Sequence, residues 1–456
     1  MTPEAVTEAV TAAIAAARDA GADDVECSYD GGEVAFHRYA RSRFTQVGAV
    51  TTGTLRVRAL VGNRLGAQLT GTLDADAVRA TARGAVDAAR NAPALDVKLA
   101  FAAPGGDASD APAAPTAREI PEAFTSAGAP ATLARAFAVA AKQSMHCAGA
   151  LKIVRRSRAV RTAAGVDRRA DEQWIVVQLI AADGDASGFA GATTDFDAPP
   201  DVAALATAAA DRAARSRDAA RVDARPYDVV LAPTAVAELV EWMSMASFGA
   251  DAVLDGQSLL AGRTGATVCS PRVTIADRAG AGEIRFDAEG SPRRDVVLID
   301  AGAAGVPVTD RITALRLGDT RGSTGHARPI ADDYGGGPTP VHLWMSAGDA
   351  SEAELIASVD DGLYVTRLHY VNGLLDTRRA VTTGMTRDGT FRIQGGKLTT
   401  GVRNLRFTDA MVDAFGDRLG GIGSATHDVP TWWSANGRLT VPAVLVRGFR
   451  FTGQSR

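Results

Sequence analysis

Histidine spacing determines whether this sequence can build a metal centre, and it indicates none. The six histidines lie far apart, at His37, His146, His326, His342, His369 and His427. None is followed by Glu, and no two lie within one helical turn. The HExxH helix, which places two imidazoles and a general base around zinc, is therefore absent. His146 and Cys147 are adjacent, but neighbouring side chains point in different directions, so a shared metal is not expected.

Patterns for nucleophiles and phosphate binding are missing as well. No G-x-S-x-G elbow occurs, and Cys27 lies in an apolar-alternating stretch where a small buried residue is expected. The run Gly395-Gly396-Lys397 is not followed by the Ser or Thr that would bind magnesium. Gly421-Ile422-Gly423 lacks the third glycine of a dinucleotide fingerprint. We interpret both runs as turns, so the residues alone predict no catalytic constellation.

Composition excludes several other classes of protein. The chain has 456 residues, of which 46% are apolar and 22% charged, as in a globular protein of two or three domains. Its net charge of −4 provides no basic field for nucleic acid, and the pairs Arg155-Arg156 and Arg378-Arg379 are expected to be solvated. Three isolated cysteines, no basic leader and no apolar run long enough for a bilayer predict a cytoplasmic protein that binds no membrane.

The elements that must position any site follow from periodicity and capping residues. Helices are predicted at 2–19, 74–92, 121–142, 200–220 and 233–247, with a last one near 409–418. Short strands are predicted at 25–29, 33–44, 51–59, 64–70, 150–160, 163–168, 173–181, 227–231, 296–300, 362–370, 389–397 and 439–451. The order helix, strands, helix occurs twice before residue 222, which suggests two similar layers.

These elements predict an α+β protein with mixed N-terminal α/β layers and a β-rich antiparallel C-terminal domain. We place an N-terminal α/β domain at 1–92 and a central α/β domain at 121–222. The segment 93–120 between them is rich in Ala, Pro, Gly and Asp and is interpreted as a linker. The β-rich domain covers 223–456.

Three stretches resemble the TldD/PmbA family, whose members have been labelled modulators of DNA gyrase. The first is Leu55-Arg56-Val57-Arg58 followed by Gly62-Asn63-Arg64-Leu65-Gly66-Ala67. The second runs from Asp251-Ala252-Val253 through Gly262-Arg263-Thr264-Gly265 to residues 273–277. The third and most specific comprises Gly362-Leu363-Tyr364-Val365, Thr383-Gly384-Met385-Thr386-Arg387-Asp388-Gly389-Thr390-Phe391 and residues 402–408. Order and spacing match from near residue 10 to the end of the chain.

The resemblance implies dimerisation around a cleft and a zinc site in only some members. Catalytic TldD-type subunits carry an HExxxH helix and a distant C-terminal Cys that together hold zinc. In this sequence Glu241 stands at the first His position, Trp242 at the general-base Glu and Ala246 at the second His. The region matching the Cys contains His427 but no thiol. Because Trp and Ala cannot bind zinc, the sequence resembles the PmbA/TldE branch, which lacks the metal motif.

The resemblance therefore implies a non-catalytic subunit of a heteromeric zinc metallopeptidase that cleaves unfolded or extended peptides. This chain would contribute no catalytic residue and no metal ligand, and a TldD-type partner would supply the zinc. It would shape one side of the cleft and present strand edges to which a peptide adds. The alternative is a zinc-free homo-oligomer that binds peptides or a precursor without hydrolysing them. An enzyme with a relocated active site is a third reading, but no such constellation is visible.

The same positions provide candidates for lining a substrate cleft. Trp242, Met243 and Met245 place apolar bulk where the family's metal lies, Met385 lies in the third stretch, and His427 lies near the lost Cys. Ordinary core packing also explains the three helical residues, and we favour it, since apolar residues at helical spacing are usually core. A hairpin with tight turns is the alternative for Met385.

Overall fold

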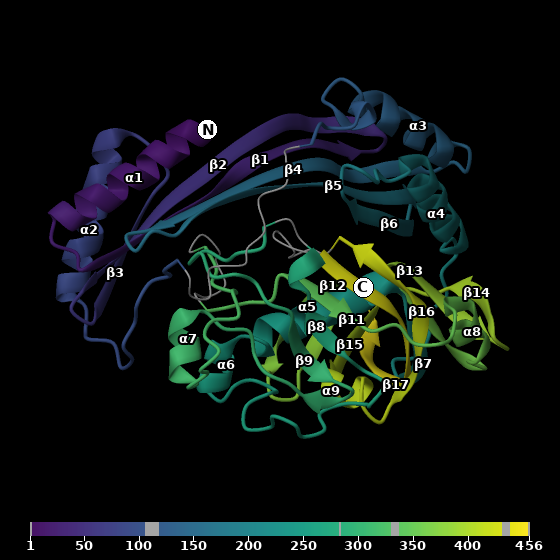
Figure 1. Cartoon of the computed structure of the whole chain (residues 1–456). Coiled ribbons are helices and arrows are strands. Elements are labelled where there is room, and N and C mark those ends of the chain that lie inside the picture. The colour runs from purple at the N-terminus through teal and green to yellow at the C-terminus, as the bar shows by residue number, and fades with distance from the viewer. Residues whose placement is uncertain (1, 105–117, 282–283, 330–336, 431–437, 455–456) are drawn as a thin grey trace.

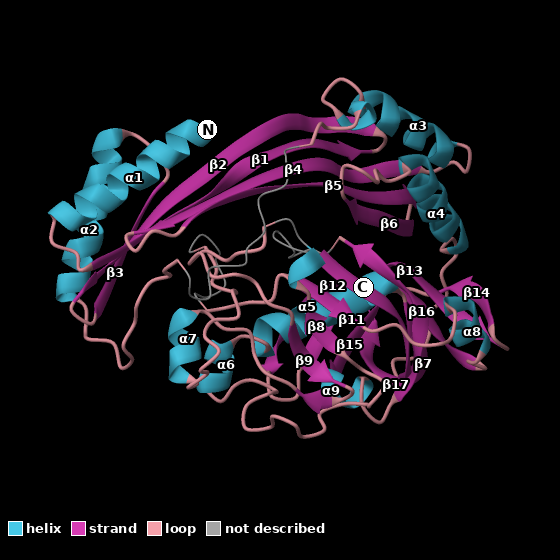
Figure 2. Cartoon of the chain, in the orientation of Figure 1, coloured by secondary structure: helices cyan, strands magenta, loops and turns pink. Residues whose placement is uncertain are grey.

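The computed structural model describes residues 2–104, 118–281, 284–329, 337–430 and 438–454. An arched six-stranded sheet from the N-terminal half lies over a C-terminal domain that contains a second sheet (Figure 1). Helices cover the arch at its two ends (Figure 2). They are α1 (Pro3–Asp19) and α2 (Ala75–Asn91) at one end, and α3 (Ala129–Ala141) and α4 (Val202–Arg215) at the other. The predicted α+β class is confirmed.

Long antiparallel strands form the arch in the order β3-β2-β1-β4-β5-β6. They are β1 (Asp24–Ala40), β2 (Arg43–Val61), β3 (Arg64–Thr70), β4 (His146–Thr162), β5 (Asp167–Asp183) and β6 (Ala186–Thr194). β1 and β4 pair at the centre, with Tyr29 opposite Ala159. The two units predicted as similar layers are therefore halves of one sheet. The domain boundaries at 92 and 121 stay predictions, but this ladder runs across them.

Capping and apolar periodicity explain the helices at the ends of the arch. The side chain of Asp74 accepts hydrogen bonds from the backbone N–H groups of Asp76 and Ala77, which starts α2 where the sequence predicts it. The buried sides of α1 and α2 pack on one face of β1 and β2, against residues such as Cys27 and Val57. Cys27 is the buried core residue that its strand context predicts.

The C-terminal domain surrounds a ring of strands. Its β7 (Pro226–Leu231), β12 (Asp361–Asp376), β13 (Val381–Gln394), β15 (Leu405–Ala410) and β17 (Arg438–Gln454) pair in turn, and β17 also pairs with β7 to close the ring. The further strands are β8 (Ile275–Asp277), β9 (Val296–Asp300), β10 (Ala303–Ala304), β11 (His342–Met345), β14 (Lys397–Gly401) and β16 (Leu419–Val429). The helices are α5 (Pro233–Ser247), α6 (Ala250–Leu254), α7 (Arg311–Arg316), α8 (Glu352–Ala357) and α9 (Met411–Ala414).

Three predicted helices are shorter than expected, and one of them, predicted at 200–220, is α4, which ends at Arg215. The helix over 121–142 is divided into a 3-10 turn at Glu122–Phe124 and α3. Between them the chain turns so tightly that a Cβ on Gly128 would lie only 2.0 Å from Glu122 O. The helix near 409–418 is reduced to the single turn α9, since β15 continues to Ala410.

The segment predicted as a linker is partly packed. Leu99 and Phe101 are buried beside Leu60 of β2, although residues 93–104 form no helix or strand. Residues 105–117 of this segment lie outside the described residues. No helix in the described parts of the chain has both the length and the apolar character needed to cross a bilayer.

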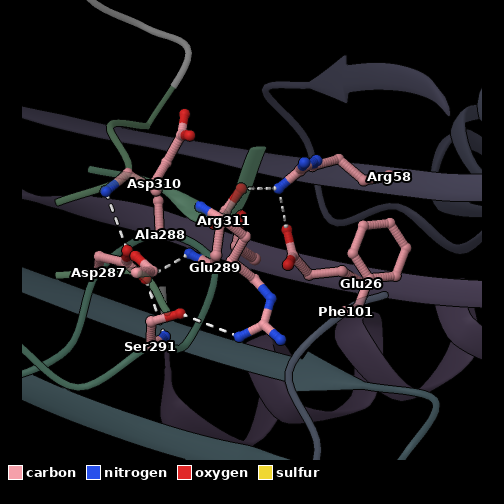
Figure 3. Close-up of polar contacts among 12 residues, drawn as sticks. Glu26, Arg58, Phe101, Asp287, Ala288, Glu289, Ser291, Asp310 and Arg311 are labelled. Carbon is pink, nitrogen blue, oxygen red and sulfur yellow. Dashed lines mark hydrogen bonds and ion pairs between the residues drawn. The ribbon is translucent and has the colours of Figure 1, made fainter. Parts of the chain in front are cut away.

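Buried charges join the arch to the C-terminal domain, and we call Glu26, Arg56, Arg58, Asp287 and Glu289 the seam. Figure 3 labels all of these residues except Arg56. Arg58 Nη1 lies 3.1 Å from Glu26 Oε1 on the neighbouring strand and 2.5 Å from Glu289 Oε1 of the C-terminal domain. Arg56 Nη2 donates to Ala288 O at 2.6 Å. Because one guanidinium bonds to carboxylates of both layers, the seam fixes the position of the arch over the domain.

A second arginine pair on the same face continues this contact. Arg158 Nε donates to Asp30 Oδ2 at 2.6 Å, and Arg156 Nε donates to Asp30 Oδ1 at 2.9 Å. The prediction that the pair Arg155-Arg156 is solvated is therefore wrong for Arg156, whose side chain is only 11% exposed. It holds for Arg155, because successive strand residues point to opposite faces.

Candidate functional site

The helix α5 carries the positions where the family resemblance places the zinc ligands. It forms where predicted, with Pro233 in its first turn and with Ala, Leu, Glu and Met through its interior. Ala232, just before the helix, donates its N–H to Val365 O of β12 at 2.9 Å. Almost every residue of α5 is buried, because β12 and β17 both pack against it. A helix buried on all sides leaves little room for a solvent-filled catalytic site.

The three degenerate positions do not fit a zinc ion. Glu241, Trp242 and Ala246 are all buried, with 6%, 4% and 6% of their surface exposed. Of the three, only Glu241 has a side-chain atom that binds zinc. Among the residues that the structure describes, no group of three or more His, Cys, Asp or Glu is arranged to hold a metal ion. No hydrolytic step through zinc can be assigned to these residues.

Close packing takes the place of the metal chemistry. A Cβ on Gly373 of β12 would lie 3.1 Å from Trp242 Cβ and 3.2 Å from its Cε3, so the indole packs directly on the strand backbone. At the end of α5, Ser247 Oγ donates to Thr377 O at 3.0 Å, and Ser258 Oγ donates to Ser247 O at 2.5 Å. These bonds tie the helix to the turn after β12 and to the loop after α6.

A charged group beside α5 links the C-terminal ring to the edge of the arch. Arg367 Nη1 of β12 lies 3.4 Å from Asp388 Oδ2 of β13, and Ser187 Oγ of β6 donates to Asp388 Oδ1 at 2.8 Å. The guanidinium of Arg367 also stacks 4.4 Å above the ring of Phe189 on β6. Buried Glu238 of α5 attracts Arg367 electrostatically. The most specific sequence stretch, which contains Asp388, therefore contacts both layers.

The candidates outside α5 lie on two other strands. Met385 of β13 is half-buried and pairs in register with His369 of β12. Burial, with Arg387 and Arg367 nearby, lowers the pKa of His369 to about 4, so its imidazole is neutral at pH 7. His427 is exposed on β16, opposite Val441. A neutral imidazole can accept a proton but has none to donate as a general acid at pH 7.

The three helical candidates are packed as core residues. Trp242 and Met243 belong to the main C-terminal core, and Met245 is partly buried against it. Their contribution to a substrate cleft stays a prediction, as it does for Met385 and His427.

The arch presents a strand edge that the sequence analysis did not single out. Among the described strands, β3 pairs only with residues 55–61 of β2, so no strand lies beside the outer edge of residues 43–54. Residues 43–52 are all exposed, including Phe44, Val47 and Val50. The signal in the sequence was a twelve-residue stretch with a single charge, Arg43, and no proline, which lacks the usual protection of an edge strand.

Comparison with known proteins places the C-terminal half in a family. Residues 224–453 match the family model described as the PmbA/TldA metallopeptidase C-terminal domain. A metalloprotease of Methanothermobacter thermautotrophicus is 26% identical over 231 residues, 49% of this chain and 48% of that protein. A metalloprotease TldD homolog of Haemophilus influenzae is 31% identical over 152 residues, 32% of this chain and 30% of that protein. The matched stretches thus span half or less of these relatives.

Solved structures extend the likeness of the fold to the whole chain. TldE from Thermococcus kodakarensis has a TM-score of 0.81 and 16% identity, covering 98% of this chain and 100% of that one. A proposed modulator of a DNA gyrase from Thermotoga maritima has a TM-score of 0.81 and 18% identity with the same coverage. At such identities the likeness concerns the fold. Because the family model matches half of the sequence, from the start of β7 to the end of β17, this chain belongs to the TldD/PmbA metallopeptidase family.

Proposed function

We propose that this chain is a non-catalytic, TldE/PmbA-type subunit of a heteromeric zinc metallopeptidase. The observation that carries the proposal is the state of α5, where Trp242 packs on Gly373 at the position of the general base and Ala246 is buried at the position of the second zinc ligand. A second family member that keeps the zinc-binding helix would supply the metal, the activated water and the general base. This chain would complete the substrate cleft.

The surroundings of α5 support a structural contribution to such a cleft. Both layers of the chain contact Asp388, so a substrate groove bounded by β12 and β13 would have walls of fixed position. The neutral side chain of His369 and the thioether of Met385 would give that wall little charge at pH 7. Such a surface suits peptides of loose sequence preference.

The exposed edge of β2 supports recognition of extended chains. On the side away from β1, its residues 43–54 present backbone N–H and C=O groups with no strand beside them among those described. An unfolded peptide adds to such an edge through main-chain hydrogen bonds, which need no particular side chains. Folded proteins lack a free extended segment and would be excluded. We therefore propose unfolded or extended peptides as the substrate class.

Native mass spectrometry of the tagged chain, purified from its own host, tests this proposal when zinc is counted per complex. We expect a complex with a second chain of similar size and one zinc ion. The tagged Trp242→Ala variant, which loses the packing of the indole on Gly373, is purified in the same way as a control. A partner that binds this variant more than the wild type binds misfolded chain. A zinc-free homo-oligomer would contradict the proposal and would favour a peptide-binding protein without hydrolase activity.

A further inference from the structure

A short hairpin of the C-terminal domain carries an arginine into the contact with the arch. Phe286 and Pro292 form an isolated antiparallel bridge, and Arg293 N donates to Arg285 O at 2.9 Å. Asp287 Oδ1 accepts from the N–H groups of Glu289 and Ser291, each at 2.9 Å, which closes the turn. The hairpin backbone is therefore held in one conformation by its own bonds.

The hairpin is fixed against β4 by close contacts. Phe286 is buried against Val160 and Ala170, and Arg158 Nη1 donates to Phe286 O at 3.4 Å. On its other side, a Cβ on Gly325 would lie 2.7 Å from Arg293 Cα, so that backbone leaves no space for the hairpin to withdraw. Arg293 is thus held at the contact between the two layers.

The guanidinium of Arg293 lacks an acceptor for two of its nitrogens among the residues that the structure describes. Its Nε and Nη1 are buried without a hydrogen-bond partner, and its side chain forms no ion pair with any residue that the structure describes. Two of the nearby acids, Asp30 and Asp277, are already engaged. Asp30 accepts from Arg156 and Arg158, and Asp277 accepts from the N–H groups of Val341 and His342 and contacts His326 at 3.2 Å.

A buried cation without acceptors is unfavourable unless another group supplies them. Burial, and then repulsion from Arg158, lower the pKa of Arg293 to about 10, which still leaves it charged at neutral pH. Asp277 and Glu172 offset part of this effect at longer range. Buried polar groups in folded proteins are almost always hydrogen-bonded, so the missing acceptor requires an explanation.

We propose that Arg293, together with Arg156 and Arg158, forms a binding site for a small oxyanion, either a carboxylate or a phosphate. The planar guanidinium matches the oxygen geometry of both groups. Arg293 as a whole is only half-buried, although its Nε and Nη1 are covered. Glu172, whose Oε1 lies 3.8 Å from Arg156 Nη1, is the carboxylate of the chain that competes for the same position. This site is separate from α5 and goes beyond the proposed function.

Thermal denaturation of the full chain in a titration with sodium phosphate or sodium acetate, at constant ionic strength set with sodium chloride, tests the proposal. An anion that binds the folded state raises the melting temperature in a saturable manner. We expect saturation for the wild type and an affinity at least roughly tenfold weaker for Arg293→Met, about 1.4 kcal/mol. Arg285→Met is the matched control, because Arg285 lies opposite in the same hairpin but is exposed; its response is expected to match the wild type.

Two further experiments identify which anion binds and test whether the loss of binding comes from misfolding. A short peptide with a free C-terminal carboxylate is compared with its amide; a response only to the free acid assigns the site to peptide termini, and a response only to phosphate assigns it to free phosphate. Glu172→Gln removes the competing carboxylate and is expected to keep or strengthen the response. No saturable response of the wild type to any of these probes overturns the proposal, as does an unchanged response in a folded Arg293→Met or Arg293→Lys variant.

Discussion

Two regions of this molecule are equally buried and chemically opposite. On α5, an indole and a methyl group stand at the positions where the family resemblance places the general base and the second zinc ligand, and Trp242 packs against Gly373. In the seam, Arg58 is buried between Glu26 and Glu289, which come from different layers. Burial alone therefore does not decide whether charge is retained. In the seam, buried acids and arginines are paired with each other, whereas α5 keeps the buried carboxylates of Glu238 and Glu241 but carries apolar side chains at the other two positions of the zinc motif.

The largest expected effect comes from breaking the seam with Arg58→Met. The change leaves the Glu289 carboxylate buried without its closest cation, and removing one member of a buried pair costs about 3–5 kcal/mol of unfolding free energy. Urea denaturation measures the loss. Arg79→Met on α2, whose pair with Asp76 is exposed, is the control and should change stability by less than about 1 kcal/mol. Equal losses in the two variants would show that the seam does not hold the layers.

A smaller effect is expected from Gly373→Ala, which tests the packing on α5. The added Cβ would lie 3.1 Å from Trp242 Cβ, and overpacking of this kind costs about 1–3 kcal/mol. This outweighs the roughly 0.5–1 kcal/mol that replacing a strand glycine can return. Gly71→Ala, whose nearest neighbour would be 3.9 Å away, is the matched control for urea denaturation. A Gly373→Ala variant as stable as this control would mean that a space remains beside Trp242.

The pH dependence of the seam gives a third test. Burial and the neighbouring Glu289 raise the pKa of Asp287 to about 7, above its ordinary value of 3.8. A carboxyl group with a raised pKa in the folded state stabilises the protein below its unfolded pKa. That contribution is lost as pH rises through the folded pKa. The stability of the wild type relative to Asp287→Asn should therefore fall between about pH 4 and pH 8 in urea denaturation. A difference that is constant over this range would contradict the raised pKa.

The smallest effect is expected at His427, which lies outside both regions. Because its side chain is exposed on β16, His427→Ala should change the unfolding free energy by less than about 0.5 kcal/mol. If His427 lines the substrate cleft, the same variant raises KM for peptide hydrolysis by the complex and leaves kcat unchanged. An unchanged KM would remove this residue from the cleft.

Local signals in the sequence predicted much of the fold. Pro3, Asp74 and Pro233 mark the starts of α1, α2 and α5 within one residue, because capping acts over a few positions. The same local view divided β1 at Gly31 and Gly32. In the structure the strand continues, since these glycines allow close approach: a Cβ on Gly32 would lie 2.0 Å from Arg155 O of β4. β6 was missed because its small residues lack a β-branched pattern.

The site was harder to predict because its partners lie far apart in the sequence. The Arg56-Val57-Arg58 alternation indicates that both arginines share a strand face, but the carboxylate of Glu289 that pairs with Arg58 comes from 231 residues later. The degenerate positions Glu241, Trp242 and Ala246 were located by family resemblance. Their burial could not be predicted, because it depends on the strands β12 and β17 that pack against α5. The unpaired state of Arg293 has no counterpart in the sequence.

The zinc content of the isolated chain tests the central claim most directly. The full chain is expressed alone, equilibrated with zinc and dialysed, and its metal is counted by mass spectrometry while hydrolysis of an unfolded peptide is assayed. We predict no stoichiometric zinc and no hydrolysis, because α5 provides one carboxylate where the zinc motif has two histidines, and the region matching the distant Cys has no thiol. One tightly bound zinc per chain together with peptide cleavage would contradict the account and make this chain a catalytic subunit.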